Sequence, residues 1–438
     1  MKRIIFGFVA ASLVAVTFAA KTSATGPAEQ AIFGALDSSG AQDAETSTQG
    51  RAVADWSLIA QNAIVAVGRK FPGEAAVHMG IVHATIYDAV VAIKGGYRPY
   101  AITPTVPPNT SVDAAVATAA HRVLVGRFPD QQAGLDNVYV AYLNGIPDAE
   151  AKTNGILVGE EVGIGMLLLR ANDGLDSIVP YVQRPPGPGV YEPTAPPPAT
   201  PLGTRMPRVL PLALEYASQF RPDGPPALHS GEYANDFNEV KDLGRVDSPV
   251  RSAEQTAVAR FWTDHDLPQW NRNLLRLADA RGLTAIETAR MLAMAHVAGG
   301  DAMIGCFDAK YHYLSWRPIH AIRRADTDGN SHTVPDPTWQ PLLPTPNHPE
   351  YPSAHACHTT AIAEALESFF GPGRLRFSLD SLVTGETRDY NRFREVIAEV
   401  NNARVWAGFH FRYSQDDGSR LGRRVARFVV RNFFQPLD

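Results

Sequence analysis

The sequence predicts an all-α fold built from helical bundles. Two observations support this prediction. Apolar residues recur at intervals of three and four positions on alanine-rich segments, and the apolar–polar alternation that marks strands is scarce. No internal repeat with a fixed period interrupts this pattern, so the helices are expected to pack as bundles.

The first helical region is expected over residues 51–177. Its apolar-periodic stretches are DWSLIAQNAIVAVGRK, AAVHMGIVHATIYDAVVAI, SVDAAVATAAHRVLVGRF and DAEAKTNGILVGEEVGIGMLLLRAND. Residues 178–228 follow, and their segment RPPGPGVYEPTAPPPATPLG is too rich in proline for a helix. Two interpretations of this segment stay open: a linker, or an ordered loop that covers the mouth of an active site.

A second helical region is expected over residues 229–438. Helical periodicity runs from about Tyr233 to Lys310, and a loop with several prolines occupies residues 326–352. Further helices are expected at about residues 356–370, 379–404 and 417–434. The 438 residues are enough for one large domain or two closely joined ones.

Composition excludes one broad class of function. The chain carries a formal net charge of −5 and has a pI near 6.2. Phosphate backbones select basic surfaces, so these values argue against a protein that binds nucleic acid. The function must therefore come from a local site.

The N-terminus has the layout of a secretory signal peptide over residues 1–24. Lys2 and Arg3 precede an apolar core, and small residues surround two possible cleavage positions, after Ala19 and after Ala24. An uncleaved membrane anchor is the alternative, because the apolar core is near the lower length limit for spanning. Cleavage is favoured, which predicts a secreted or periplasmic protein without stable membrane insertion. Residues 25–50 are expected to be flexible, and no other segment is expected to span a bilayer.

Only two cysteines occur, Cys306 and Cys357. One pair does not make a disulfide framework, although a secreted protein allows a bridge. Whether they pair is left open at this stage, and two buried thiols are favoured.

The first block of candidate site residues is KYHYLSWRP, residues 310–318. Lys310 and Arg317 are seven positions apart, so on a helix they share one face, about 10 Å apart along its axis. Pro318 disfavours helical geometry at the preceding residue, and the helix is therefore expected to end at Arg317. Two cations on a helix face are usually only solvated, but Trp316 and nearby tyrosines would partly desolvate them here.

The second block is YPSAHACH, residues 351–358. Ser353 is a good N-cap for the helix that follows, and free backbone N–H groups at a helix start favour an anion. His355 would lie beside an anion held there, whereas His358 is expected to be structural. The three histidines that include His348 lack a standard zinc spacing, so zinc is disfavoured.

The third block is NARVWAGFHFRYSQDDG, which contains Arg404 and His410. On a continuous helix these two residues would face different directions. Gly408 offers a helix end, after which His410 can turn inward. Together the three blocks supply three cations, a helix N-terminus and two histidines. This inventory suits a tetrahedral oxyanion with several negative charges.

These motifs resemble the signature shared by vanadium-dependent haloperoxidases and type 2 phosphatidic acid phosphatases. The signature is Lys-x6-Arg-Pro, then Pro-Ser-Gly-His, then Arg-x5-His. In this sequence it reads Lys310…Arg317-Pro318, Pro352-Ser353-Ala354-His355 and Arg404…His410. The helical N-terminal half also resembles secreted bacterial haloperoxidase-like proteins. The resemblance implies an all-helical fold with two four-helix bundles around one oxyanion site, with vanadate (V5+) as cofactor.

The resemblance also implies roles for individual residues. His410 would bind vanadium through its imidazole, and His355 would act as acid–base at the opposite apical oxygen. Lys310 would polarise bound peroxide, so that hydrogen peroxide and halide yield hypohalous acid for an organic acceptor. The oxyanion would be held by Lys310, Arg317, Ser353, the Ala354 N–H group and Arg404.

The phosphatase alternative uses the same residues, with His410 forming a phosphohistidine and His355 protonating the leaving alcohol. Three features favour the peroxidase: the long helical N-terminal half, Trp316 before the arginine, and His348 five residues before Ser353. Bromoperoxidases resemble this chain in carrying histidine at that last position, so bromide is favoured, with His348 and Trp316 as halide-tuning candidates. Related phosphatases often have aspartate four residues after the last histidine, where this sequence has Ser414.

Ala354 replaces the glycine of the family motif. Alanine keeps the backbone N–H group but tolerates a positive φ poorly. We therefore expect a negative φ at residue 354.

Overall fold

The computed structural model describes residues 50–147, 149–194 and 200–437. The expected signal peptide 1–24 and all but the last residue of segment 25–50 lie outside these residues and stay predictions. The described residues belong to one compact unit. The predicted all-α fold class is confirmed, and the strands that are described form one short antiparallel hairpin.

Helices α2 to α6 make up the N-terminal half. The sequence pattern did not predict α5, because Leu135 and Val138 are its only buried residues and its apolar periodicity is weak. The bounds are α2 (Arg51–Gln61), which continues as a π-helical turn (Asn62–Val67), α3 (Pro72–Lys94), α4 (Val112–Arg127), α5 (Gln132–Asn144) and α6 (Ala149–Leu169).

The C-terminal half contains the remaining α-helices and the hairpin. Short 3-10 turns at Met206–Arg208 and Ala325–Thr327 lie in the loops. The elements are α7 (Gly231–Leu243), α8 (Ala253–Phe261), α9 (Asp266–Ala280), α10 (Ala285–Tyr313), α11 (Pro318–Arg323), α12 (Ala354–Phe370), β1 (Phe377–Asp380), β2 (Thr387–Tyr390), α13 (Phe393–Trp406) and α14 (Arg412–Asn432).

The helix expected over residues 379–404 is wrong in its first part. Strands β1 and β2 pair there, with Phe377 opposite Tyr390. Gly385 turns the chain between them at a φ of +72°, a conformation that glycine adopts readily. The helix begins only at Phe393, whose ring packs 4.7 Å from that of Phe377. The two strands carry many polar residues, so the sequence pattern did not predict a hairpin here.

Serine or threonine N-caps set the start of several helices. Each cap side chain accepts a hydrogen bond from a backbone N–H group of the first turn, which would otherwise lack a partner. At α8 and α10 the third helical residue returns a side-chain hydrogen bond, which completes a capping box. The caps are Ser111, Ser230, Ser252, Thr284 and Ser353.

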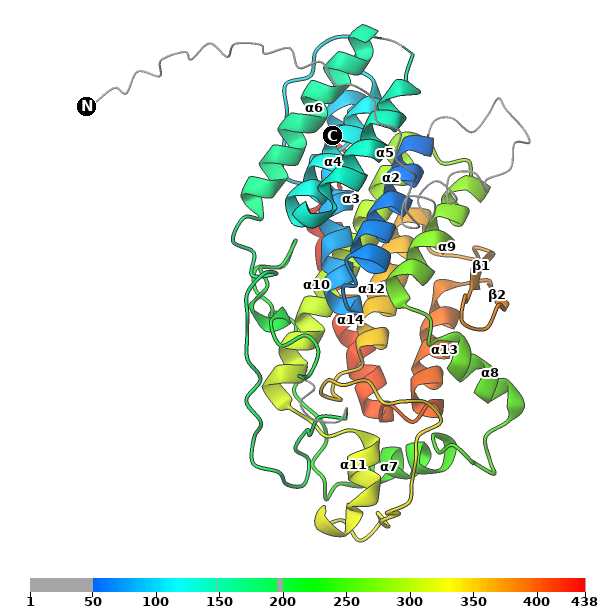
Figure 1. The fold of residues 1–438 in the computed structure, drawn as a ribbon. Coiled ribbons are helices and arrows are strands. Elements are labelled where there is room, and N and C mark those ends of the chain that lie inside the picture. The colour runs from blue at the N-terminus through cyan, green and yellow to red at the C-terminus, as the bar shows by residue number, and fades with distance from the viewer. Residues whose placement is uncertain (1–49, 148, 195–199, 438) are drawn as a thin grey trace, which may run out of the picture. The chain divides into compact units, whose positions relative to one another are not determined.

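Helix α10 connects the two halves of the fold. It packs against α3 along one side and against α12 and α14 along the other (Figure 1). Helices α10, α12, α13 and α14 contact one another and form the C-terminal bundle. Almost every residue of α10 from Met291 to Lys310 is buried. Its polar residues must therefore be satisfied by partners inside the protein.

Helices α4 and α6 approach closely because α6 carries a glycine every four residues. A Cβ atom at Gly155 or Gly159 would lie 2.5 or 2.6 Å from a backbone oxygen at the facing edge of α4. One at Gly163 would lie 2.7 Å from Cβ of Arg122. At these glycines α6 therefore has no room for a side chain of its own against α4.

Helix α3 is long and apolar enough to cross a membrane by length and composition, which the sequence analysis did not expect. In its most apolar window, however, 89% of the residues are buried inside the protein. The central helix of a packed core shows the same combination.

The proline-rich segment 178–228 is held to the body of the protein in the parts that the structure describes. Tyr191 donates its backbone N–H to the carbonyl of Leu314, and Trp316 donates to Gly189. The buried carboxylate of Asp301 on α10 accepts hydrogen bonds from three successive backbone N–H groups, those of residues 212–214. These contacts favour an ordered loop over a linker.

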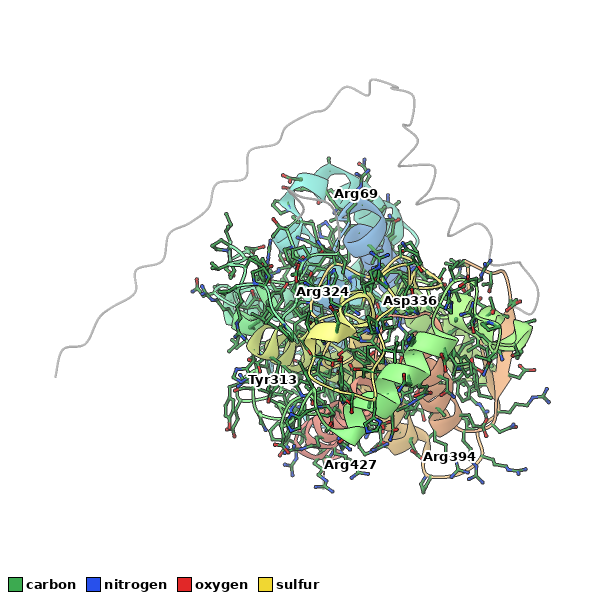
Figure 2. All side chains as sticks on the ribbon, turned by 90° about the horizontal axis from the view of Figure 1, so that it is seen from below. Arg69, Tyr313, Arg324, Asp336, Arg394 and Arg427 are labelled. Atoms are coloured by element: carbon green, nitrogen blue, oxygen red, sulfur yellow. The ribbon has the colours of Figure 1, made fainter. Side chains whose placement is uncertain are left out.

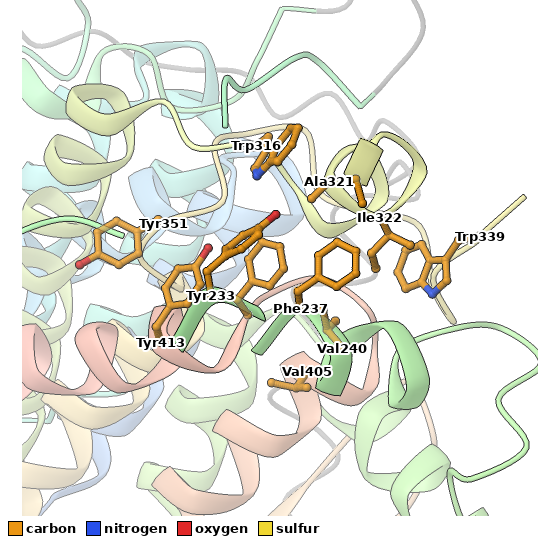
Figure 3. Packing of buried hydrophobic residues seen from close by; sticks show 12 residues of the cluster. Tyr233, Phe237, Val240, Trp316, Ala321, Ile322, Trp339, Tyr351, Val405 and Tyr413 are labelled. Carbon is orange, nitrogen blue, oxygen red and sulfur yellow. The ribbon is translucent and has the colours of Figure 1, made fainter. Parts of the chain in front are cut away.

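An aromatic cluster fills the space between α7, α11 and α14. Figure 3 shows Tyr233 of α7 close to Tyr413, with Phe237 further along toward Ile322. Tyr351, at the start of the YPSAHACH stretch, belongs to the same cluster. Figure 2, drawn from the end where α7 and α11 lie, shows these two helices in front, with Arg324 labelled beside them.

The close contact of α4 and α6 gives a test of the fold. We expect Gly159→Ala to lower the free energy of unfolding by about 1–3 kcal/mol, because the added methyl group overlaps the Ala115 carbonyl. Gly134→Ala on α5 is the matched control, since its methyl group meets nothing within 4 Å. We expect this control to stabilise by up to about 1 kcal/mol. Urea denaturation of both variants measures the difference, and equal effects would contradict the α4–α6 contact.

Candidate active site

The expectation of one continuous helix from Lys310 to Arg317 is wrong. Helix α10 ends at Tyr313, because Leu314 adopts a left-handed conformation with a φ of +52°. Ser315 then forms a β-bridge with Val190 of the proline-rich segment. Arg317 has extended geometry as the N-cap of α11. The bridge to Val190, 125 positions away in the chain, holds Ser315 in a non-helical conformation. A contact over this separation cannot be predicted from local sequence.

Lys310 is fully buried near the end of α10. Its ammonium group donates to the carbonyl oxygens of Pro349, Glu350 and Pro352 at 2.8, 2.9 and 2.6 Å. These three bonds use all three ammonium protons. Lys310 therefore fixes the backbone that leads into Ser353, and it brings its positive charge to the same place.

Arg317 links the first block to the other two. Its Nε donates to the His348 carbonyl at 2.8 Å, and its Nη1 donates to the Phe409 carbonyl at 3.0 Å. The same Nη1 lies 3.2 Å from Nε2 of His410, and Nη2 lies 3.0 Å from Nδ1 of His348. The guanidinium group thus joins loop 347–353 to the segment that follows α13.

Arg404 lies in the last turn of α13 and is 3% exposed. Its Nη1 donates to the Trp262 carbonyl at 2.9 Å, and its guanidinium group stacks on the Phe409 ring, 4.6 Å from the centroid. Its Nε is buried and has no hydrogen-bond partner in the structure. A buried donor without a partner is costly, and an anion at this position would satisfy it.

The helix start predicted at YPSAHACH is confirmed. Ser353 is the N-cap of α12, and its hydroxyl accepts from the Ala356 N–H. Ala354 is the first helical residue, and its φ is not among the positive values, as expected. His355 follows on the first turn, where its Nε2 is buried without a hydrogen-bond partner.

Asp266 at the start of α9 is a buried carboxylate that interacts with both histidines of α12. His358 is fully buried and places its Nδ1 3.2 Å from Asp266 Oδ2, which agrees with a structural role. Burial opposes ionisation of Asp266, but the neighbouring imidazoles of His358 and His355 outweigh it and hold its pKa below the usual range. Asp266 therefore lies beside the candidate acid–base as a buried anion.

Glu350 orients His410. Its Oε1 lies 2.8 Å from Nδ1 of His410 and also accepts the Phe411 N–H at 3.2 Å. Arginine has no acceptor, so the contact with Arg317 makes Nε2 of His410 the acceptor nitrogen. His410 is therefore the Nδ1–H tautomer, and the Nε2 lone pair faces the cations. Ser414 adds only a long contact of 3.5 Å to Nδ1.

Burial and like charges shift the ionisation of the whole site. Burial lowers the pKa of Lys310 to about 8 and that of Arg317 to about 10. Burial, with the charge of Arg317, lowers the pKa of Arg404 to about 9. Burial and then the three cations hold the pKa of His410 well below its usual value. All three cations act on His410, so the three sequence blocks converge on one imidazole.

The pKa values of His355 and Glu350 are shifted by the same causes. Burial, and then the charge of Arg404, lowers the pKa of His355 to about 3. Burial raises the pKa of Glu350 to about 7, against the pull of Arg317 and Lys310. The site therefore presents neutral imidazoles among buried cations, which is an electrostatic environment for an anion.

The halide-tuning candidates occupy different places. His348 is buried against Arg317 and packs its ring 5.3 Å from that of Phe307. Trp316 lies in the aromatic cluster with Tyr233 and Phe237, with the Arg324 guanidinium 5.9 Å from its ring. His348 therefore contacts an oxyanion-site residue directly, whereas Trp316 supports the segment before Arg317. Both tuning roles stay predictions.

The sequence motifs did not predict Glu350 or Asp266 as site residues. Glu350 immediately precedes the YPSAHACH block, and an acidic residue between two prolines at that position could have indicated it. Asp266 comes from WTDHDLPQW, more than 80 positions before His355. No local pattern connects it to the site.

Comparison with known proteins supports the resemblance. Residues 290–438 match the family model described as the VCPO second helical-bundle domain. No curated protein matches the sequence. The first bacterial vanadium-dependent iodoperoxidase to be solved is similar over 91% of this chain and 99% of its own, with 23% identity and a TM-score of 0.74.

A bacterial vanadium-dependent chloroperoxidase is similar in two forms. The apo form has 17% identity and a TM-score of 0.65 over 82% of this chain and 93% of its own. The holo form has 16% identity and a TM-score of 0.66 over 88% and 98%. The family model matches the part of the chain that carries the three motif blocks, and these solved structures share the fold of the chain. At these sequence identities, the structural similarity establishes a shared fold and nothing more specific.

The shifted ionisation of the site predicts a pH dependence of anion binding. Sulfate serves as a tetrahedral probe whose charge is constant over the range. As pH rises through about 7, Glu350 gains a negative charge, and through about 8, Lys310 loses its positive charge. Both changes weaken binding, so the affinity measured by calorimetry should fall between pH 6 and 9, by at most about tenfold per pH unit for each proton.

Two variants separate these steps. Glu350→Gln should remove the fall near pH 7, and Lys310→Arg should remove the fall near pH 8 because arginine stays charged. An unchanged pH profile in both variants would contradict this assignment.

Proposed function

We propose that this chain is a vanadium-dependent haloperoxidase that oxidises halide, with bromide favoured, to hypohalous acid using hydrogen peroxide. One observation carries the proposal: Nε2 of His410 faces the buried guanidinium group of Arg317, and the charges of Lys310 and Arg404 act on the same imidazole. Its direction is fixed by the Glu350 carboxylate behind it.

The donor set fits vanadate. Arg404 and His355 each have a buried nitrogen without a partner, and Ser353 caps the helix start beside them. Vanadate would be held by Arg317, Arg404, Ser353 and the Ala354 N–H, under the charge of Lys310, with His410 Nε2 as the nitrogen ligand. When bound, it would supply Lewis-acid activation of peroxide without a change of oxidation state.

The residues of the chain perform the remaining work. His355 is neutral at working pH, so its Nε2 is available to accept a proton from incoming hydrogen peroxide. The Asp266 carboxylate near it stabilises the resulting imidazolium. Lys310 and Arg317 keep positive charge where oxygen charge accumulates. Burial excludes water from these groups and strengthens each interaction.

The halide preference rests on His348. Its ring accepts a hydrogen bond from Arg317. A change at His348 would therefore alter the guanidinium group that is proposed to hold the oxyanion. Resemblance to bromoperoxidases at this position favours bromide. Iodide and chloride belong in the same assay, because the structural neighbours include an iodoperoxidase and a chloroperoxidase.

A phosphatase that acts through phosphohistidine is the second candidate, and the Glu350–His410 pair favours it. The missing aspartate at position 414 counted slightly against a nucleophilic histidine. Glu350 supplies the orienting carboxylate in its place, at 2.8 Å. A histidine oriented by a carboxylate suits nucleophilic attack on phosphate, so the serine at position 414 does not disfavour the phosphatase.

We also propose a secreted or periplasmic location. The N-terminal sequence alone supports it, with two basic residues, an apolar core and small residues at the cleavage positions. N-terminal sequencing of the mature protein from its native host, together with cell fractionation, tests this location.

The peroxidase proposal predicts bromination of a phenolic dye only when vanadate, hydrogen peroxide and bromide are all present. Phosphate should suppress it by competing for the same cations. His410→Ala should reduce the rate at least about 100-fold, because the nitrogen ligand is lost. His332→Ala, at an exposed histidine in the loop after α11, is the matched control and should retain full activity. Bromination that persists after vanadate is stripped and excluded would overturn the proposal.

The phosphatase alternative predicts that vanadate inhibits the same protein, whereas the peroxidase proposal requires vanadate for activity. Hydrolysis of p-nitrophenyl phosphate would be inhibited by vanadate, and a phosphohistidine would be trapped at His410. Glu350→Gln should slow such hydrolysis by roughly 10- to 1000-fold through loss of the orienting carboxylate. Absence of both phosphate release and phosphohistidine in wild-type protein would exclude this candidate.

A further inference from the structure

The two cysteines form a buried thiol pair next to the oxyanion site. Both are free and buried, and they are near enough for each thiol to shift the pKa of the other. Cys306 also donates a long hydrogen bond of 3.5 Å to the Pro352 carbonyl oxygen. The favoured interpretation of two buried thiols is confirmed, and the contact between them is a further finding.

The pair lies between the two helices that present the site. Cys306 is one turn before Lys310 on α10, and Cys357 is one turn after Ser353 on α12. The carbonyl of Pro352 accepts from both Cys306 and the ammonium group of Lys310, the latter at 2.6 Å. A change at the thiols therefore acts on the same carbonyl that Lys310 holds.

We propose that Cys306 and Cys357 are a redox modification site, at which an oxidant of the peroxide class converts the two thiols to a disulfide that ties α10 to α12. The proposed function is used only for the source of oxidant, because a haloperoxidase takes in hydrogen peroxide beside this pair. A buried cysteine is usually inert. Here the neighbouring charges and a small oxidant change that expectation.

The two thiols are unequal. Burial alone opposes ionisation of Cys306, but the neighbouring Cys357 thiol and the charge of Lys310 outweigh it and place its pKa below the usual value. Burial and the neighbouring Cys306 thiol raise the pKa of Cys357. Cys306 is therefore the sulfur that attacks, and Cys357 is the one that resolves.

The reaction balances in two steps. The Cys306 thiolate attacks one oxygen of hydrogen peroxide, the O–O bond breaks, and the hydroxide that leaves takes up the thiol proton to give water and a sulfenic acid. The Cys357 sulfur then displaces the sulfenic hydroxyl group, which leaves as a second water when it takes the Cys357 proton. Two thiols and one peroxide thus give one disulfide and two waters.

The test treats purified full-length protein with hydrogen peroxide, without added vanadate or halide. We expect both thiols to disappear together, with loss of two hydrogen atoms in mass and a Cys306–Cys357 cross-linked peptide, and dithiothreitol should restore both. The oxidised protein should unfold at a higher urea concentration than the reduced protein, because the bridge closes a long loop. Free thiols that survive the treatment, or sulfinic acids in place of the bridge, would overturn the proposal.

Two alanine variants keep the result interpretable. Alanine suits these buried positions because buried cysteine behaves as a small apolar residue. In Cys357→Ala, peroxide should leave a sulfenic acid at Cys306 that dimedone labels, and urea resistance should not rise. In Cys306→Ala, Cys357 should stay a thiol at the same peroxide dose. Bromination plays no part in these readouts, so failure of the peroxidase proposal is detected separately.

Discussion

Three cations are buried close together, and holding them there is the constraint on which the rest of the site depends. Desolvating a single charge costs several kcal/mol even in a relaxed protein interior, and like charges add repulsion. Lys310, Arg317 and Arg404 are held chiefly by backbone carbonyl oxygens. Carbonyl groups offset desolvation without cancelling the positive charge, so the site keeps its attraction for an anion.

This arrangement explains the path of the loops. Loop 347–353 lies within reach of both Lys310 and Arg317, and its carbonyl groups point at them. The proline-rich segment prevents α10 from continuing to Arg317. The Leu314 carbonyl accepts the Tyr191 N–H, and the Trp316 N–H donates to Gly189, so these groups bond outside the helix. The N-terminal half supports α10 through α3, and in this way it positions Lys310 from a distance.

The proposed function makes the site a receptor for a tetrahedral oxyanion, and the same residues would then suit both redox and hydrolytic chemistry. Vanadate and phosphate share shape and charge, so the cations do not distinguish them. The two proposed chemistries differ at His410, which would be a metal ligand in one and a nucleophile in the other. A carboxylate behind the imidazole, here Glu350, increases its basicity and serves both roles.

Much of this protein was determined by local sequence. Helical periodicity, the Ser353 cap and the break at Gly408 depend on residues within one or two turns of each other, and these predictions are confirmed. The hairpin at β1–β2, the early end of α10 and the roles of Glu350 and Asp266 were decided only by tertiary structure. The site features in this second group each depend on a partner far away in the chain, as Glu350 depends on His410. Such partners meet only after packing has fixed both backbones.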